Sequence, residues 1–70
     1  MPKLFSTKKI EKVLLKQGFY FVSQKGSHIK YRKKNDHVYT VIVPGNRKEI
    51  PIGTFRSICR QARLVENDFK

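Results

Sequence analysis

The segment FYFVSQKGSHIKYRKKNDHVYTVIV, residues 19–43, decides the fold, because it holds three short runs of aromatic and β-branched residues separated by turn residues. Gly26-Ser27 marks the first turn and Asn35-Asp36 marks the second. The three runs are Phe19–Ser23, His28–Lys33 and His37–Val43. The segment therefore predicts three consecutive strands joined by hairpins.

The segment before the strands, residues 6–17, has the pattern of an amphipathic helix. Its apolar positions recur at helical spacing and are Ile10, Val13 and Leu14. Ser6 or Thr7 can cap the start of this helix, and Gly18 can supply the left-handed residue that ends it.

A second helix is indicated after the strands, starting at Gly53 or Thr54. Its apolar residues recur at i, i+3, i+4 and i+7 and are Phe55, Ile58, Cys59 and Ala62. Residues 66–70 either fray or add one helical turn, and the sequence does not decide between the two. The whole order predicts an α+β fold of the double-stranded-RNA-binding-like type, α-β-β-β-α, with a three-stranded antiparallel sheet and two helices packed on one face.

The net charge points to a polyanionic partner. The 16 Lys and Arg against 5 Asp and Glu give 16 − 5 = +11, and residues 1–35 alone carry 10 − 1 = +9. Such a surface attracts phosphate backbones, since each neutralised phosphate releases counterions. An anionic membrane surface or an acidic protein also fits this charge, and a Lys-rich surface can simply keep a small protein soluble.

Composition also excludes several classes of protein. Seventy residues suffice for one domain, residues 1–70. One cysteine excludes an internal disulfide and, with two histidines, cannot complete a four-ligand zinc site, so we expect no metal and no cofactor. No apolar stretch approaches the roughly 18 residues of a membrane span, and no secretory signal is recognisable. We expect a soluble, cytoplasmic protein without membrane attachment.

The two histidines are the candidate proton-transfer groups, because an imidazole titrates near neutrality. RNA carries its own nucleophile, the 2′-hydroxyl, so one positioned acid or base is enough to cut a strand. If Asn35-Asp36 is the hairpin tip, residues whose numbers sum to 71 face each other, and His28 faces Val43 while His37 faces Lys34. The two imidazoles then lie about 20 Å apart, too far to share one phosphate.

His28 is the better placed of the two, because it follows the Gly26-Ser27 turn and is flanked by Lys25 and Lys30. A phosphate bound there would meet cations and an imidazole together. Spacing alone nevertheless favours an ordinary surface histidine. His37, beside a turn aspartate, is expected to be a solvated turn residue.

The start of the second helix is a further candidate for anion binding, because free amides and the positive end of the helix dipole favour a phosphate. Thr54 lies at this start, and Arg47 and Lys48 precede it. A plain helix start explains the same residues. Cys59 lies on the apolar stripe, so we expect a core residue whose thiol pKa is raised by burial, not a nucleophile.

Four landmarks, in this order, resemble the HicA toxins, the RNA-cutting halves of HicA–HicB toxin–antitoxin pairs. The landmarks are Gly18-Phe19, Gln24–His28, Val43–Asn46 and Ile52–Ala62. The resemblance covers roughly positions 7 to 64. Three positions depart from the family's usual residues: Phe55 stands for a leucine, Asn46 for a histidine, and Arg63 for a glycine suited to a left-handed helix end.

The resemblance implies a single HicA-like domain that is an mRNA interferase, a toxic endoribonuclease acting on single-stranded mRNA without metal and without the ribosome. It implies a HicB-like antitoxin that covers the active site. The catalytic histidine of the family's Gly-Ser-His motif corresponds to His28. Ser27 of the same motif, with Lys25 and Lys30 nearby, is then a candidate phosphate contact.

Two other functions remain open from the residues. A non-catalytic RNA-binding module of the same fold would bind RNA without cutting it. Duplex-RNA binders usually carry a lysine cluster at the start of the last helix, whereas residues 54–57 read TFRS. A structural protein that docks on an acidic partner would have no RNA affinity.

Overall fold

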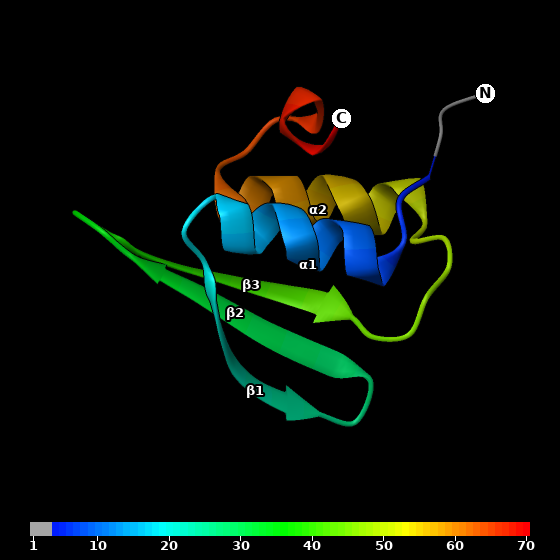
Figure 1. Ribbon diagram of the computed structural model, residues 1–70, viewed down its shortest axis with the longest axis horizontal. Helices are drawn as coiled ribbons and strands as arrows, with labels where there is room; N and C mark the ends of the chain where they lie inside the picture. The colour runs from blue at the N-terminus through cyan, green and yellow to red at the C-terminus, as the bar shows by residue number, and fades with distance from the viewer. Residues whose placement is uncertain (1–3) are drawn as a thin grey trace.

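The computed structural model describes residues 4–70 and has the expected order of elements (Figure 1). Its helices are α1, Thr7–Lys16, and α2, Ile52–Ala62; its strands are β1, Tyr20–Lys25, β2, His28–Lys34, and β3, Val38–Pro44. A 3₁₀ turn, η1, follows at Glu66–Phe69. The sheet is antiparallel in the order β1-β2-β3, and both helices lie on one side of it. The α-β-β-β-α prediction is confirmed.

The first helix forms as its pattern predicts. The Ser6 hydroxyl accepts a hydrogen bond from the Lys9 amide at 3.1 Å, so Ser6 and not Thr7 is the N-cap. The predicted apolar positions Ile10, Val13 and Leu14 are all buried against the rest of the core. Gly18, with φ of 96°, takes the left-handed conformation that turns the chain into β1.

The register between β2 and β3 differs by one residue from the predicted one. Partner numbers sum to 72, so His28 lies opposite Pro44 and not Val43. The physical reason is the turn: the Asn35 amide donates to the His37 carbonyl at 2.9 Å, so the turn takes in His37 as well as Asn35-Asp36. β3 therefore begins one residue later than predicted, at Val38.

The second helix begins at Ile52, slightly before the predicted Gly53 or Thr54. Pro51 is its N-cap, and the Pro51 carbonyl accepts the first helical hydrogen bond, from the Phe55 amide at 2.9 Å. The helix ends at Arg63, which has φ of 58° and ψ of 37°, a left-handed conformation that glycine adopts more easily.

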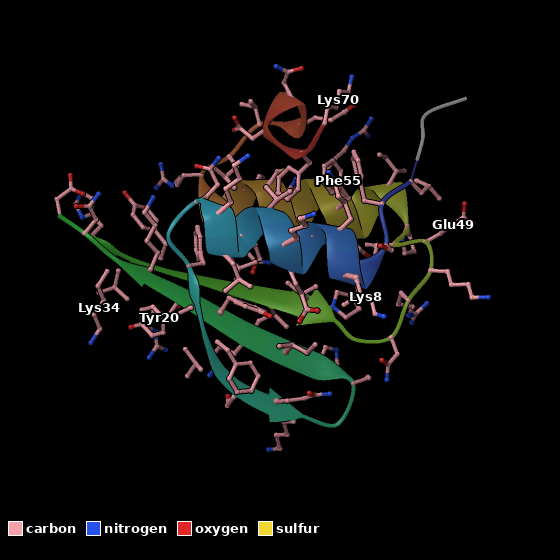
Figure 2. All side chains as sticks on the ribbon, viewed as in Figure 1. Lys8, Tyr20, Lys34, Glu49, Phe55 and Lys70 are labelled. Carbon is pink, nitrogen blue, oxygen red and sulfur yellow. The ribbon has the colours of Figure 1, made fainter. Side chains whose placement is uncertain are left out.

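The core lies between the sheet and the helices. η1 lies on the far side of the helices and adds Phe69 to the same core (Figure 1). Phe69 of η1 is 0% exposed, and its ring packs edge-on against Phe55 of α2 at a centroid distance of 5.1 Å. Residues 66–69 thus form a turn rather than fraying, which settles what the sequence left open. Figure 2 shows Tyr20 and Lys34 on the opposite side, projecting from the face of the sheet that no helix covers.

Candidate functional site

A tight hairpin turn places His28 at the first position of β2. Gly26, with φ of 60°, occupies the first central position of a two-residue turn between the paired residues Lys25 and His28. This is the geometry of a II′ turn, which requires glycine at that position. The side-chain amide of Gln24 donates to the Gly26 carbonyl at 3.2 Å and holds the turn.

The uncovered face of the sheet brings three of the predicted site residues together. Lys25 lies opposite His28 across β1 and β2, and Ser23 lies opposite Lys30 in the next row. These four side chains and Ile42 line one open depression of about 400 Å³. His28 is exposed there, and none of the three strands contains an acidic residue. The depression therefore offers an imidazole and two ammonium groups to an anion.

The loop after β3 is fastened beside this depression at Ser27. The Gly45 amide donates to the Ser27 carbonyl at 2.6 Å. A Cβ atom at position 45 would lie 3.3 Å from that carbonyl oxygen and 3.4 Å from the Ile29 side chain, so the close approach favours glycine. The Ser27 carbonyl thus holds the loop in place beside the depression, and the Ser27 side chain is exposed.

Thr7 of α1 holds the same loop from the helix layer. Its hydroxyl donates to the Pro44 carbonyl at 2.7 Å and accepts from the Arg47 amide at 3.0 Å, while its own amide donates to the Arg47 carbonyl at 2.9 Å. Thr7 is 4% exposed, so these bonds are partly shielded from water. The sequence suggested only a capping role, because partners some 40 residues away have no local pattern.

Arg47 and Lys48 line a second depression, of about 540 Å³, at the start of α1 rather than of α2. Lys8, which no sequence motif marks as a site residue, lies there with them. Glu11 is the one carboxylate of this lining, and one of its oxygens accepts the Tyr31 hydroxyl hydrogen bond at 2.6 Å. Thr54 lies in the first turn of α2 and lines neither depression.

The two histidines lie at opposite ends of the β2–β3 hairpin. His28 pairs with Pro44 at one end, and His37 belongs to the turn at the other end. The corrected register leaves their separation at about 20 Å by strand rise. One phosphate therefore cannot contact both imidazoles.

The Cys59 thiol and the Tyr31 hydroxyl both have a raised pKa, which disfavours their reactive, deprotonated forms. Burial, with smaller effects from the nearby Glu66 and Asp68 charges, raises the pKa of the Cys59 thiol. Burial, the hydrogen bond to Glu11 and the Glu11 charge raise the pKa of the Tyr31 hydroxyl above its ordinary value. Within residues 4–70, no three His, Cys, Asp or Glu side chains are grouped to hold a metal ion. No helix in the described chain is long and apolar enough to span a bilayer.

Comparison with known proteins shows the class of protein to which this chain belongs. A family model described as HicA toxin of bacterial toxin-antitoxin matches residues 7–64. The protein is thus a toxin of the kind found in bacterial toxin–antitoxin systems. Because the match spans well over half of its residues, the chain belongs to the HicA toxin family. No curated protein matches the sequence.

Proposed function

We propose that this chain is an endoribonuclease, an mRNA interferase that cuts single-stranded mRNA with His28 as general acid or base. The observation that carries the proposal is the open depression that His28 shares with Lys25 and Lys30. Membership of a toxin family supports an activity directed at an essential cellular polymer. The net charge of +11 supports a polyanion as that polymer.

The reaction needs two proton transfers. The 2′-hydroxyl oxygen of one nucleotide attacks the adjacent phosphorus and loses its proton, and the bond from phosphorus to the 5′-oxygen breaks as that oxygen gains a proton. The products are a 2′,3′-cyclic phosphate and a 5′-hydroxyl end. His28 carries out one of the two transfers. Lys25 and Lys30 offset the negative charge that develops on the phosphoryl oxygens.

The proposed RNA path extends beyond the scissile phosphate. Ser27 presents its side chain at the turn next to His28, and the Gly45 hydrogen bond ties this turn to the loop that leads to Arg47 and Lys48. We assign flanking phosphates to these two cations. Thr54, at the N-terminus of α2, stays a candidate contact on helix-dipole grounds.

The test compares purified wild type with His28→Ala on single-stranded RNA in the presence of EDTA. We expect cleavage in EDTA, and a loss of about 10²–10⁴-fold in rate for His28→Ala, with RNA affinity changed little. His37→Ala is the matched control, since it removes an exposed imidazole at the far end of the hairpin. Undiminished cutting by His28→Ala would refute the mechanism, and loss of cutting in EDTA would refute metal independence.

The open cationic face also fits a non-catalytic RNA-binding module. That function predicts salt-dependent RNA binding by the wild type, no cleavage at any pH, and little effect of His28→Ala beyond one lost contact. The cleavage assay above therefore separates the two functions directly.

The proposal places the toxin in the cytoplasm, with its mRNA substrate, and includes a HicB-like antitoxin that covers the His28 face. A cationic toxin and an acidic inhibitor associate fast because of electrostatic steering. Induction of the wild type should arrest growth, whereas induction of His28→Ala should not. Co-expression of a HicB-like antitoxin should restore growth.

A further inference from the structure

Among residues 4–70, the free edge of β3 has backbone groups without hydrogen-bond partners. The Ile42 amide donates to the side chain of Gln61 at 2.9 Å, so this amide points away from β2. Since backbone groups alternate in direction along an antiparallel strand, the amides and carbonyls of Val38 and Thr40 point to the same free edge. Neither amide donates to any group outside the sheet among residues 4–70. α2 thus covers the edge at Ile42 and leaves it open further along.

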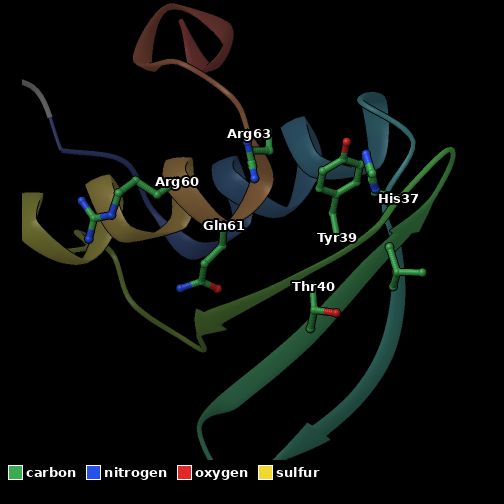
Figure 3. Close-up of a pocket in the computed structure, with 7 residues that line it drawn as sticks. His37, Tyr39, Thr40, Arg60, Gln61 and Arg63 are labelled. Atoms are coloured by element: carbon green, nitrogen blue, oxygen red, sulfur yellow. The ribbon is translucent and has the colours of Figure 1, made fainter.

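This open part of the edge lies in a depression of about 510 Å³ (Figure 3). Residues 37–40 line it from the strand side, and Arg60, Gln61 and Arg63 line it from α2. Both arginines are exposed, and within residues 4–70 neither has a carboxylate within ion-pair distance. The lining contains no acidic residue, so the depression has a positive potential.

Arg63 occupies a backbone conformation that disfavours its side chain. Its φ of 58° lies in the left-handed region, where glycine avoids the steric cost that any Cβ atom brings. A strained residue with a long cationic side chain, placed beside an open strand edge, indicates a use for that side chain.

We infer that this edge of β3 binds an extended acidic segment of a partner protein, which adds a fourth strand to the sheet. Unpaired backbone groups at a strand edge are satisfied by another extended polypeptide, and arginines pair with carboxylates in a fixed fork geometry. RNA has no backbone amides to match the edge, so a polypeptide fits better. The antitoxin partner that the toxin family implies is the protein we expect to supply this segment.

The inference is independent of the proposed cleavage chemistry. The open edge begins at Val38, whereas His28 lies opposite Pro44 at the other end of β3. A partner could therefore hold the toxin at this edge whether or not the same partner covers His28. Failure of RNA cleavage would leave the edge proposal standing, and failure of peptide binding would leave the cleavage proposal standing.

The first test uses a synthetic peptide of alternating Glu and Val residues, titrated into the ¹⁵N-labelled protein. We expect shifts and slowed hydrogen exchange at the Val38 and Thr40 amides. Arg60→Gln combined with Arg63→Gly should weaken binding about tenfold, because two partly exposed charge pairs are lost. Arg56→Gln, on the same helix but outside the depression, should change binding less than about twofold. Arg63→Gly relieves the left-handed strain, so its loss of binding would not come from unfolding.

The second test uses two N-methylated versions of the peptide, one methylated at the Glu amides and the other at the Val amides. In a paired strand, one set of amides faces β3 and the other faces solvent. One methylated peptide should therefore lose binding while the other keeps it. Equal behaviour of the two peptides, equal loss with Arg56→Gln, or no binding up to about 1 mM peptide would overturn the proposal. Protection of the same two amides by a single-stranded RNA would also overturn it.

Discussion

On the helix side of the sheet, Ile29, Tyr31, Val41 and Val43 are at most 7% exposed, whereas the other side presents His28 and a row of cations to solvent. The same strands make both faces, because successive side chains point in opposite directions. Burial restricts the helix side, which we call the inner face, to residues that pack against the core. The exposed side, which we call the outer face, has no such restriction, and water and salt weaken the repulsion between its like charges. The residues that hold the fold and those that serve the proposed chemistry thus lie on different faces of the sheet.

The largest expected effect lies in the core on the helix side of the sheet, at Phe69 of η1. This ring is 0% exposed and contacts both Phe5 and Phe55. Phe69→Ala should lower the free energy of unfolding by about 3–4 kcal/mol in urea titrations, because it leaves a cavity in the core. The cleavage rate per folded molecule should not change. A loss below about 1 kcal/mol would show that η1 is not part of the core.

A control for Phe69 lies in the same turn. Lys70 and Glu66 form an exposed ion pair at 3.7 Å. Lys70→Gln should change the free energy of unfolding by less than about 0.5 kcal/mol, since exposed pairs of this kind contribute little.

The next largest effect is expected at Thr7, because this residue ties the helix layer to the loop beside the His28 depression. Thr7→Val removes the hydroxyl that bonds to the loop residues Pro44 and Arg47. We expect a loss of about 2 kcal/mol in the free energy of unfolding, since two partly buried backbone groups lose their partner. RNA cleavage should fall further than the folded fraction, because the same loop is bonded to Ser27 beside His28.

Thr7→Ser is the matched variant for this prediction, since it keeps the hydroxyl and removes one methyl group. It should recover most of the stability and of the cleavage rate. If Thr7→Val and Thr7→Ser have equal cleavage rates per folded molecule, Thr7 does not position the loop for the outer-face site.

The contrast between the faces also explains what the sequence could predict. Alternation and helical spacing are local, so the order of elements and the buried residues of α1 were both predictable. The register of β3 was not, because one hydrogen bond inside the turn, from Asn35 to His37, decides it. Phe69 has no periodic neighbours that would mark it as core.

The candidate site was predictable to the same extent. The turn motif itself brings Lys25, His28 and Lys30 together, and the structure places them in one depression. Arg47 and Lys48 were expected beside Thr54, yet they line a depression at the start of α1. The long-range bonds of Thr7 fix that loop, and bonds between residues so far apart leave no pattern in the sequence.

Tyr31 is a smaller test of the inner face, with a defined pH dependence. The pKa of its hydroxyl is raised above 10.0, so the protonated form is the one that stabilises the fold. This contribution is complete below about pH 10 and is lost as the pH rises further. Tyr31→Phe should cost about 1 kcal/mol at pH 7, through the lost hydrogen bond to Glu11.

The pH dependence supplies the control for Tyr31. The difference in unfolding free energy between wild type and Tyr31→Phe should shrink between pH 10 and pH 11, because only the wild type loses the Tyr31 contribution. Urea titrations at pH 8, 10 and 11 measure this difference. A difference that stays constant over this range would contradict the buried, hydrogen-bonded state of the hydroxyl.

The smallest expected effect lies on the outer face, at Lys30. Its ammonium group lines the His28 depression, so Lys30→Gln should remove one phosphate contact without changing the fold. The slope of log Kd for single-stranded RNA against log salt should fall by about 0.7, with affinity reduced only a few-fold. Lys12→Gln, an equal charge change at an exposed position of α1, should leave the slope closer to that of the wild type. Equal slopes for the two variants would mean that RNA binding depends only on the net charge of +11. RNA would then have no specific binding site on the outer face.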